Sequence, residues 1–411
     1  MLAAGTLPAV GAPGDLSPAR GDITALGVLP TVRAERLGGK QWGLAAVGAE
    51  GAWGITRGAG ITVAVLDSGV DETHPDLAGH LLPAVDLVED GRAGDAFGHG
   101  TRVAGVIAAA LDGAGIAGLA GESQVLPIRI LTATGEGDQN RTARGIRAAV
   151  AAGAQVINLS LSSPSQSTFQ AEAIQFALDH GVVVVAAAGN RREEGSPTVF
   201  PAAYPGVIGV SSVGRDLAIS DFASQGTAID LVAPGGQILT TQVGGGWESD
   251  DGTSLAAAFV SAAVALVRAA NPTLAPDAVA QVLFDTARDL GAPGRDDDFG
   301  HGLLRADRAV HAAAGLPGGV GIPSVALTVG ALASGSRLSV DIDPDLATGA
   351  WTFHVQRLRP SGAWRTLRRS FTTRGEQETR IVNLPRGTYR VRVPSRLGFD
   401  GSTSVPVTLN R

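Results

Sequence analysis

The chain has 411 residues and lacks cysteine, so disulfide bonds, thiolate nucleophiles and sulfur ligands for metals are all excluded. Hydrophobic residues make up 44% of the sequence, and the length is enough for one large domain with a smaller one, or for two to three average domains. The net charge of −7 is mild for this size. It argues against a general nucleic-acid-binding protein, because such proteins carry a basic surplus.

The first 40 residues are rich in Gly, Pro and Ala, show weak periodicity, and predict a leader or a truncated pro-region. The N-terminus, MLAAGTLPAVGAPGD, contains neither a basic segment nor a continuous apolar core, so no signal peptide is visible in the sequence. No stretch of about 20 apolar residues lacks a charge or a turn signal, and we therefore expect no membrane span.

From Ile61 onward, short apolar runs alternate with Ala-rich segments of helical spacing. Strands are predicted at 61–67, 125–131, 154–161 and 182–190. Helices are predicted at 99–111, 140–153, 168–180, 253–270 and 275–289, the last with Pro276 just inside its start. Because such strands are buried on both sides, the pattern predicts an α/β domain over residues 41–315, with a parallel sheet covered by helices on both faces.

A Gly- and Pro-rich segment at 316–322 predicts a linker. The residues beyond it, 323–411, contain short β-type segments separated by Gly, Pro and Asp turns, which predict a small all-β sandwich. This part holds 13 Arg against 6 Asp plus Glu, which leaves a net charge of −14 on the rest of the chain. The Arg surplus fits docking on the acidic part of the chain, attraction to anionic partners, or an ordinary solvated surface.

Three motifs in the α/β part contain the residue types that nucleophilic catalysis needs. In VAVLDSGVDETHPDL, Asp67 ends an apolar strand, the place where parallel sheets position their functional residues. In FGHGTRVAGVIAAA, His99 stands between two glycines at the start of an apolar helix. In DGTSLAAAFVSAAVALV, Ser254 opens another apolar helix, so its hydroxyl and its N–H lie at the positive end of that helix.

These side chains complement one another chemically. A serine hydroxyl is a poor nucleophile at neutral pH and needs an adjacent base, which histidine provides because its pKa lies near neutrality. A buried carboxylate holds the imidazole in the correct tautomer and stabilises its charged form. Asn190, at the end of the apolar run VVVVAAAGN, can donate an amide N–H to the anionic oxygen of a tetrahedral intermediate, together with the Ser254 N–H.

Each of these residues alone has a more ordinary explanation, since a strand-end Asp or an Asn after Gly is most often a turn residue and a Ser at a helix start an N-cap. The combination is not expected to arise by chance. His99 follows Asp67 by 32 residues, Ser254 follows His99 by 155 residues, and each of the three stands in an extended motif. The lipase signature Gly-x-Ser-x-Gly at the serine and the metalloprotease signature His-Glu-x-x-His are absent. The remaining histidines are predicted to be structural or surface residues: His74, His80, His180, His301, His311 and His354.

The motifs resemble those of the subtilisin-like serine proteases. DSG at Asp67, HGT at His99, AAAGN at Asn190 and GTS at Ser254 match the family's active-site motifs in its order Asp, His, Ser. The resemblance covers about residues 41–313 and includes QWGL, HPDL, INLSLS, VAPG and GHGLLRADRAV. It implies a serine endopeptidase that acts on protein or peptide substrates through an acyl-enzyme intermediate and needs no cofactor for the chemistry. The alternative is a weak or silent homologue that acts as a binding module.

The resemblance also implies substrate contacts, made largely by backbone groups that pair with an extended peptide. Two strand edges would hold the peptide, 187–189 would form the wall of the main side-chain pocket, and Val199 and Phe200 would lie near its floor. A branched residue at the floor favours small or medium apolar side chains. The implied substrate-binding residues are Gly135, Glu136, Gly137, Ser160, Leu161, Ser162, Ala188 and Gly189.

The sequence departs from the family pattern at two places near these residues. Ser162 stands where a glycine is common, a change that can narrow a subsite. After Ser254, the family's Met-Ala-x-Pro-His-Val is Leu-Ala-Ala-Ala-Phe-Val, which alters the first helical turn beside the nucleophile. Neither change removes a catalytic group.

By resemblance, a structural calcium site is implied near Gln41, Asp76 and Asp112. The loop ALDGAGIAG lies at the same distance from His99 as the family's calcium loop, and oxygen ligands without sulfur suit calcium. A plain Gly-rich turn explains the same residues equally well. No nucleic-acid or membrane partner is expected, and the resemblance implies a monomer that is secreted and acts outside the cell.

Overall fold

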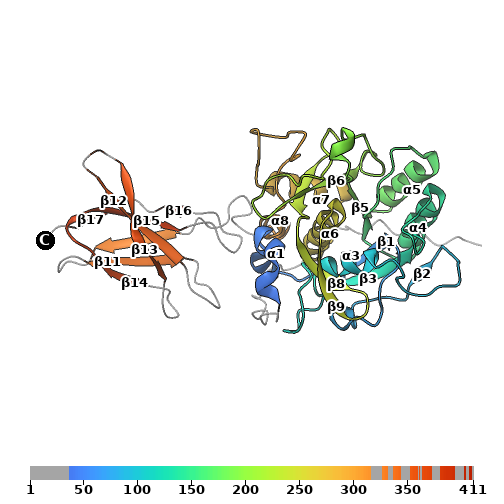
Figure 1. Ribbon diagram of the computed structural model, residues 1–411, viewed down its shortest axis with the longest axis horizontal. Coiled ribbons are helices and arrows are strands. Elements are labelled where there is room, and N and C mark those ends of the chain that lie inside the picture. Colours follow the sequence, from blue (N-terminus) through green and yellow to red (C-terminus); the bar gives the residue numbers. More distant parts are fainter. Residues whose placement is uncertain are drawn as a thin grey trace, which may run out of the picture.

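The computed structural model describes residues 37–315 and several shorter ranges in the C-terminal part (Figure 1). These shorter ranges are 326–331, 337–343, 352–359, 361, 363–372, 380–393, 402–403 and 407–409. The predicted leader up to residue 36 and the predicted linker at 316–322 lie outside the described residues.

A seven-stranded parallel sheet forms the centre of the first part, in the order β2-β3-β1-β4-β5-β6-β7. Its strands are rich in Val and Ile and are buried along almost their whole length, because helices cover both faces. The predicted parallel sheet is thereby confirmed. The strands are β1 (Thr62–Asp67), β2 (Val85–Asp86), β3 (Gln124–Arg129), β4 (Val156–Leu159), β5 (Val183–Ala187), β6 (Val207–Val213) and β7 (Leu231–Pro234).

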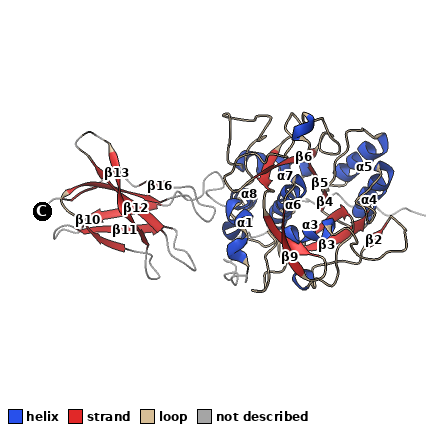
Figure 2. Cartoon of the chain, viewed as in Figure 1, coloured by secondary structure: helices blue, strands red, loops and turns tan. Residues whose placement is uncertain are grey.

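Helices lie on both faces of this sheet (Figures 1 and 2). One face is packed by α6 with α3 and α8 beside it, and the other by α4 and α5, so the sheet has a hydrophobic core on each side. The helices are α1 (Trp42–Ala46), α2 (Ala49–Trp53), α3 (His99–Ala108), α4 (Gln139–Ala151), α5 (Thr168–Asp179), α6 (Thr253–Ala270), α7 (Pro276–Thr286) and α8 (Ala306–Ala313), with short 3-10 turns at Gly38–Lys40, Pro75–Leu77 and Arg192–Glu194.

Helix α6 is the central element of the larger core. Among the described helices it alone is long and apolar enough, by length and composition, to cross a membrane, but most of it is buried inside the protein. Small residues dominate its sequence, TSLAAAFVSAAVALVRAA, and they let the helix approach the sheet closely. The serine of the GTS motif is the second residue of this helix, so the apolar core fixes its position.

The predicted helices and their boundaries are borne out to within a few residues, for identifiable local reasons. The Asp138 carboxylate accepts the N–H of Arg141 and caps α4. Ser167 caps α5 in the same way by accepting the N–H of Gln170. Pro276 occupies the first turn of α7, as expected.

An antiparallel hairpin that the sequence did not predict packs on α3. Its strands are β8 (Ile238–Gln242) and β9 (Gly246–Asp250), and β9 leads directly into the GTS motif. The Thr241 hydroxyl donates to the Thr101 carbonyl at 2.7 Å, and the hairpin approaches so closely that a Cβ on Gly105 would lie 2.2 Å from Thr241 Oγ1. The hairpin thus connects the helix of the histidine with the segment of the serine.

The C-terminal part forms two antiparallel sheets, which confirms a small β domain after the α/β part (Figure 2). Most of the predicted β segments are strands, whereas β10 was not predicted. One sheet has the order β10-β11-β14, made of β10 (Ala326–Ala331), β11 (Arg337–Asp343) and β14 (Arg380–Asn383). The other contains β12 (Thr352–Leu358), β13 (Trp364–Thr372), β15 (Gly387–Val393), β16 (Ser402–Thr403) and β17 (Val407–Leu409).

Candidate active site

The order of the strands explains why distant segments meet. Strands β3, β1, β4 and β5 are neighbours and run in parallel, so their carboxyl ends lie at one edge of the sheet. Asp67 is the last residue of β1, and the predicted substrate residues at 135–137, 160–162 and 188–189 follow the other three strands, with Asn190 next in the chain. The carboxyl edge of a parallel sheet is the usual place for a functional site.

Asp67 and His99 form a hydrogen-bonded side-chain pair at this edge. The ring Nδ1 of His99 lies 2.9 Å from each carboxylate oxygen of Asp67, and the N–H of Ser68 donates to Asp67 Oδ1 at 2.7 Å. Asp67 is fully buried, while the His99 side chain remains 20% exposed. Because a carboxylate can only accept, the proton of the neutral ring is on Nδ1, and Nε2 carries a lone pair.

The surroundings of His99 act on its pKa in opposite directions. Burial of the ring lowers the pKa, but the charge of Asp67 and its hydrogen bond raise it by more, so the net pKa lies above its ordinary value. Two further charges oppose each other, since Arg102 lowers the pKa of His99 and Asp250 raises it.

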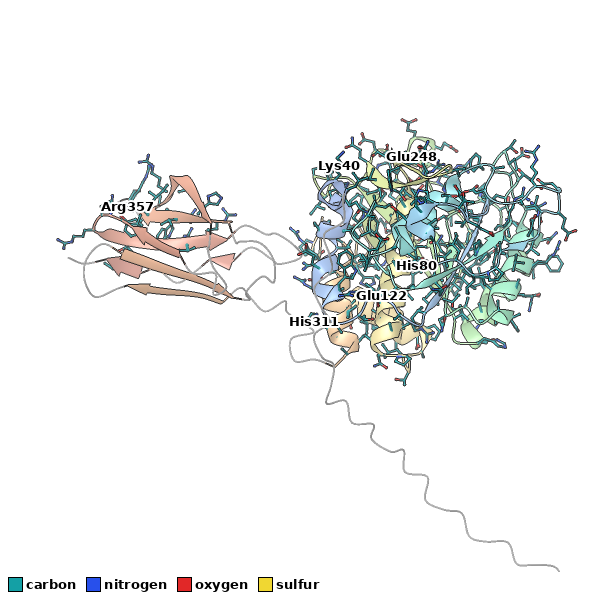
Figure 3. The ribbon with its side chains drawn as sticks, turned by 90° about the horizontal axis from the view of Figure 1, so that it is seen from below. Lys40, His80, Glu122, Glu248, His311 and Arg357 are labelled. Carbon is teal, nitrogen blue, oxygen red and sulfur yellow. The ribbon has the colours of Figure 1, made fainter. Side chains whose placement is uncertain are left out.

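These two charges belong to one ion-pair cluster between α3 and β9. Arg102 lies one helical turn after His99 and contacts Asp250 at 2.9 Å and Glu248, labelled in Figure 3, at 2.8 Å. The cluster joins the helix of the histidine to the strand that leads to Ser254. It therefore places compensating charges beside the imidazole while fixing the hairpin.

Ser254 lies at the N-terminus of α6 and is held through its neighbour Ser160. The Ser160 hydroxyl donates to the Ser254 carbonyl at 3.0 Å, and the Ser254 hydroxyl donates to the Ser160 carbonyl at 3.3 Å. In the part of the chain that the structure describes, the Ser254 hydroxyl bonds this carbonyl and not His99. Catalytic hydrogen bonds of substrate-free enzymes often form only when substrate binds, so this geometry is compatible with a serine–histidine pair.

Asn190 is oriented by Thr253, the residue before the serine. Its Oδ1 accepts from the Thr253 N–H at 3.0 Å and from the Thr253 hydroxyl at 2.8 Å, which turns the amide Nδ2 the other way. A Cβ placed on Gly252 would lie 3.6 Å from both Asn190 Nδ2 and the Ser254 backbone N. Asn190 Nδ2 and the Ser254 N–H therefore lie on the same side of Gly252.

Two of the segments predicted to bind substrate, 160–162 and 188–189, meet at Gly189. A Cβ on Gly189 would lie 3.3 Å from Ser162 Oγ and 3.5 Å from Val199 Cγ2, so both side chains border the end of β5. The backbones of Ser163 and Phe200 exchange two hydrogen bonds of 2.8 Å, which tie the 160–162 segment to the predicted pocket floor. Ala188 itself is buried.

Phe97 is a neighbour of the site that the sequence did not single out. Its ring lies 6.3 Å from the His99 ring between centroids and is 43% exposed. A Cβ on Gly135 would lie 2.7 Å from this ring, so the ring covers the start of the 135–137 segment. Only its place two residues before His99 could have suggested a role.

Two of the predicted calcium ligands are tied to the backbone of the 110–118 loop. The Gln41 amide donates to the Ala117 carbonyl at 2.7 Å and accepts the Ala117 N–H at 2.9 Å, so both of its ends are used. Asp112 is exposed, and its Oδ1 accepts the N–H of Ala114 within its own turn.

The third, Asp76, is a buried carboxylate that meets N–H donors. Its Oδ2 accepts from the Ile116 N–H at 2.9 Å and from the Trp247 indole at 2.7 Å. Across the described ranges, no cluster of three or more Asp, Glu or His side chains could hold a metal ion. In this structure Gln41 Oε1, Asp76 Oδ2 and Asp112 Oδ1 each accept a protein N–H.

Serine hydrolases are the class of enzymes that this fold and this arrangement of side chains define. Within that class, the chain belongs to the subtilase family, whose family model matches residues 58–302. It is therefore a serine endopeptidase that acts on proteins or peptides, and members of this family need no cofactor for catalysis.

Individual relatives agree with this assignment. Subtilisin Savinase of Lederbergia lenta is 36% identical over 275 residues, which cover 65% of this chain and 97% of that protein. Fervidolysin of Fervidobacterium pennivorans is 35% identical over 320 residues, 70% of this chain but only 46% of that protein. A solved protease structure from Pseudoalteromonas arctica has a TM-score of 0.62 and 32% identity, over 69% of this chain and 99% of that one. None of these similarities favours a binding module without activity.

The charge cluster beside His99 predicts opposite shifts of the acid limb of kcat/KM. The sequence predicts His99 as the general base, and on that prediction activity should need the neutral imidazole and be lost as pH falls through the pKa of His99, which lies above the ordinary value of 6.5. Asp250→Asn should move this limb to lower pH, and Arg102→Gln should move it to higher pH. Both shifts should shrink at about 1 M salt, because the cluster is partly exposed. Shifts of the same sign in both variants would show that the cluster does not act on His99 through its charges.

Proposed function

We propose that Ser254 is the nucleophile of the peptidase, His99 its general base, Asp67 the partner that orients the imidazole, and Asn190 a donor to the oxyanion. The observation that supports this proposal is the pairing of His99 Nδ1 with both Asp67 oxygens at 2.9 Å. It leaves Nε2 as a base with a pKa above the ordinary value, suited to accept the proton of a serine hydroxyl.

In the acylation half-reaction, Ser254 Oγ attacks the carbonyl carbon of the scissile peptide bond, and His99 Nε2 takes the hydroxyl proton. The carbonyl π electrons move to oxygen, and the resulting anion is met by Asn190 Nδ2 and the Ser254 N–H. Asp67 stabilises the imidazolium without taking its proton. When the C–N bond breaks, His99 returns the proton to the leaving amine.

In the deacylation half-reaction, a water molecule takes the place of the departed amine. His99 Nε2 removes a proton from that water as it attacks the ester carbon. The same two N–H donors meet the second oxyanion. Collapse of this intermediate breaks the bond to Ser254 Oγ, which recovers its proton from His99.

We propose that the substrate binds as an extended peptide between the 135–137 and 160–162 segments, by backbone pairing. These segments follow strands on either side of β1, at the same sheet edge as Asp67. Val199 and Ser162 beside Gly189 limit the room for a side chain at this point, which supports a preference for small or medium apolar residues. Glu136, Gly137 and Leu161 would contribute mainly through their backbone groups.

A serine-directed fluorophosphonate tests the roles of Ser254 and Asn190 together. The probe should label one residue, Ser254, and Ser254→Ala should lose both labelling and peptidase activity. Asn190→Ala should remain folded and lose about two to three orders of magnitude in kcat, as is typical for the loss of one oxyanion donor. Labelling elsewhere, or activity of Ser254→Ala within tenfold of wild type, would refute the assignment. A folded wild type that is neither labelled nor active would favour the silent homologue.

We also propose that the 110–118 loop is stabilised by protein hydrogen bonds without a structural calcium ion. Its backbone is bonded by Gln41 and by Asp76, and the Asp76 carboxylate is bonded in turn by the Trp247 indole. A ligand that binds only the folded state raises the melting temperature, so a calcium site would be visible in unfolding.

The melting temperature should therefore be the same, within about 1 °C, in millimolar calcium and in excess chelator. Trp247→Phe should instead lower the stability by about 1–3 kcal/mol in both conditions, because the buried carboxylate loses a donor. A calcium-dependent rise in the melting temperature of the wild type would show that the loop binds the metal.

The division of the chain is likewise a proposal. We propose a leader over 1–40, a peptidase domain over 41–315, a linker over 316–322 and a separate β domain over 323–411. Two features support it: the family match ends at residue 302, and the later strands pair only with one another in the described sheets. We further propose that the protein acts outside the cell as a monomer, as its resemblance to subtilisins implies.

Removal of residues 318–411 should leave kcat/KM for small peptide substrates within about threefold of wild type, because the proposed catalytic groups all precede residue 260. Capture of large protein substrates can decrease in the same variant, since the Arg surplus of the β domain is lost. A truncated chain that is folded by circular dichroism but inert on small peptides would show that the β domain shapes the active site.

A further inference from the structure

Asp95 is a buried carboxylate that neither the sequence motifs nor the proposed chemistry uses. It lies in the loop before α3 and is 8% exposed. Five donors surround its two oxygens: the Ser68 hydroxyl at 2.8 Å, the Phe97 N–H at 3.2 Å, the Gly98 N–H at 2.7 Å, and the N–H and hydroxyl of Thr101 at 2.8 and 2.7 Å. Burial of a carboxylate is costly unless hydrogen bonds compensate for it, and the five donors around Asp95 provide that compensation.

The first role of these bonds is to cap the helix that begins at His99. A helix leaves its first N–H groups without partners, and Gly98, at the N-cap position, has no side chain to accept them. Asp95 accepts the N–H of Gly98 and of Thr101 instead, and its charge favours the positive end of the helix. The start of α3, and hence the backbone of His99, is fixed from a residue four positions earlier.

The second role links Asp95 to Asp67. The Ser68 hydroxyl, which donates to Asp95, also accepts the N–H of Gly100 at 3.0 Å. The backbone N–H of the same Ser68 donates to Asp67 Oδ1. Ser68 therefore bridges the end of β1, where Asp67 is the last residue, and the first turn of α3, where His99 is the first residue.

We infer that Asp95 is a positioning residue for the reaction: it sets the relative placement of Asp67 and His99 by capping α3 and anchoring Ser68. It touches neither the substrate nor the reacting atoms, so it acts only through the Asp67–His99 pair. This inference rests on the proposed roles of those two residues. Misplacement of a catalytic group by about 1 Å can cost on the order of 100-fold in rate, so a positioning role is large enough to measure.

Asp95→Asn is the test, because asparagine has the same shape but replaces one acceptor oxygen with a donor that faces protein N–H groups. We expect kcat to fall at least about tenfold and KM to change less than about threefold. In an Asp67→Asn background, Asp95→Asn should cost less than about threefold more, because residues that act as a unit are not additive. The matched control is Asp307→Asn. Asp307 lies on α8, is also a buried carboxylate, and pairs with Arg305 at 2.8 Å. This substitution should lower the melting temperature without changing kcat.

The outcomes separate the possible failures. If Asp67→Asn retains wild-type turnover, the proposed catalytic roles are refuted. If Asp67→Asn is crippled while folded Asp95→Asn keeps wild-type kcat, or if the two losses multiply fully, Asp95 has a structural role only and the inference is overturned. If Asp95→Asn does not fold, Ser68→Ala replaces it, since it removes the bridge and keeps the direct cap. Ser68→Ala should lose less kcat than Asp95→Asn would, because the cap remains, but should show the same non-additivity with Asp67→Asn; an unchanged kcat or additive losses would overturn the inference.

Discussion

The hydrogen bond between the Asp67 carboxylate and His99 Nδ1 is the interaction on which the rest of this structure depends. Asp67 is fully buried at the end of a central strand, where an isolated charge would be very costly. It is tolerated because the Ser68 N–H and the His99 ring both donate to it. Any displacement of α3 would leave the carboxylate without its main partner, so the placement of the helix and the ionisation of the site are coupled.

The surroundings of this pair can be understood from that coupling. Asp95 caps the helix that holds His99, the hairpin β8–β9 bonds the same helix from outside, and Arg102 joins the two. The hydrogen bonds and ion pairs are made by the first turn of α3, and the hairpin also packs closely against Gly105 further along the helix. The contacts that stabilise α3 therefore also fix the position of His99 relative to Asp67.

The serine side of the site is held by a separate buried polar chain. Ser261 on α6 donates to Asn158 on β4 at 2.9 Å, Asn158 donates to the Ser160 hydroxyl at 2.9 Å, and Ser160 donates to the Ser254 carbonyl. Asn158 and Ser261 are fully buried, so the chain fixes the height of α6 above the sheet. One half of the site is thus positioned through α3 and the other through α6, and the two helices also pack against each other.

How far the sequence predicts this arrangement depends on how local each feature is. The apolar runs and helical periods of β1, β3, β4 and β5 and of α3 to α7 are local patterns, and they are recovered to within a few residues. Strand β6 was missed because Gly and Ser interrupt its apolar pattern, and β7 because it is only four residues long and ends in Pro. The motif residues Asp67 and His99 were identified because chemistry restricts their types.

Contacts between distant segments could not be predicted in this way. The Trp247 indole donates to Asp76, 171 positions away in the sequence, and Asp76 is one of the residues that the calcium hypothesis placed near the metal. Asp95 and Phe97 stand close to His99 in sequence, but nothing in their spacing reveals that one is buried under five donors and the other lies over Gly135. The contacts of Asp95 and Phe97 depend on the direction in which each side chain points from the loop before α3, and the sequence does not specify that direction.

The central claim is that Asp67 sets the tautomer and the ionisation of His99, and nitrogen NMR of the His99 ring across pH tests it most directly. The account predicts that the neutral ring has its proton on Nδ1, that Nε2 is unprotonated, and that the ring ionises above its ordinary pKa of 6.5. Asp67→Asn should lower that pKa, because burial of the ring then acts without an opposing carboxylate. A neutral ring protonated on Nε2, or a pKa that Asp67→Asn leaves unchanged, would contradict the account.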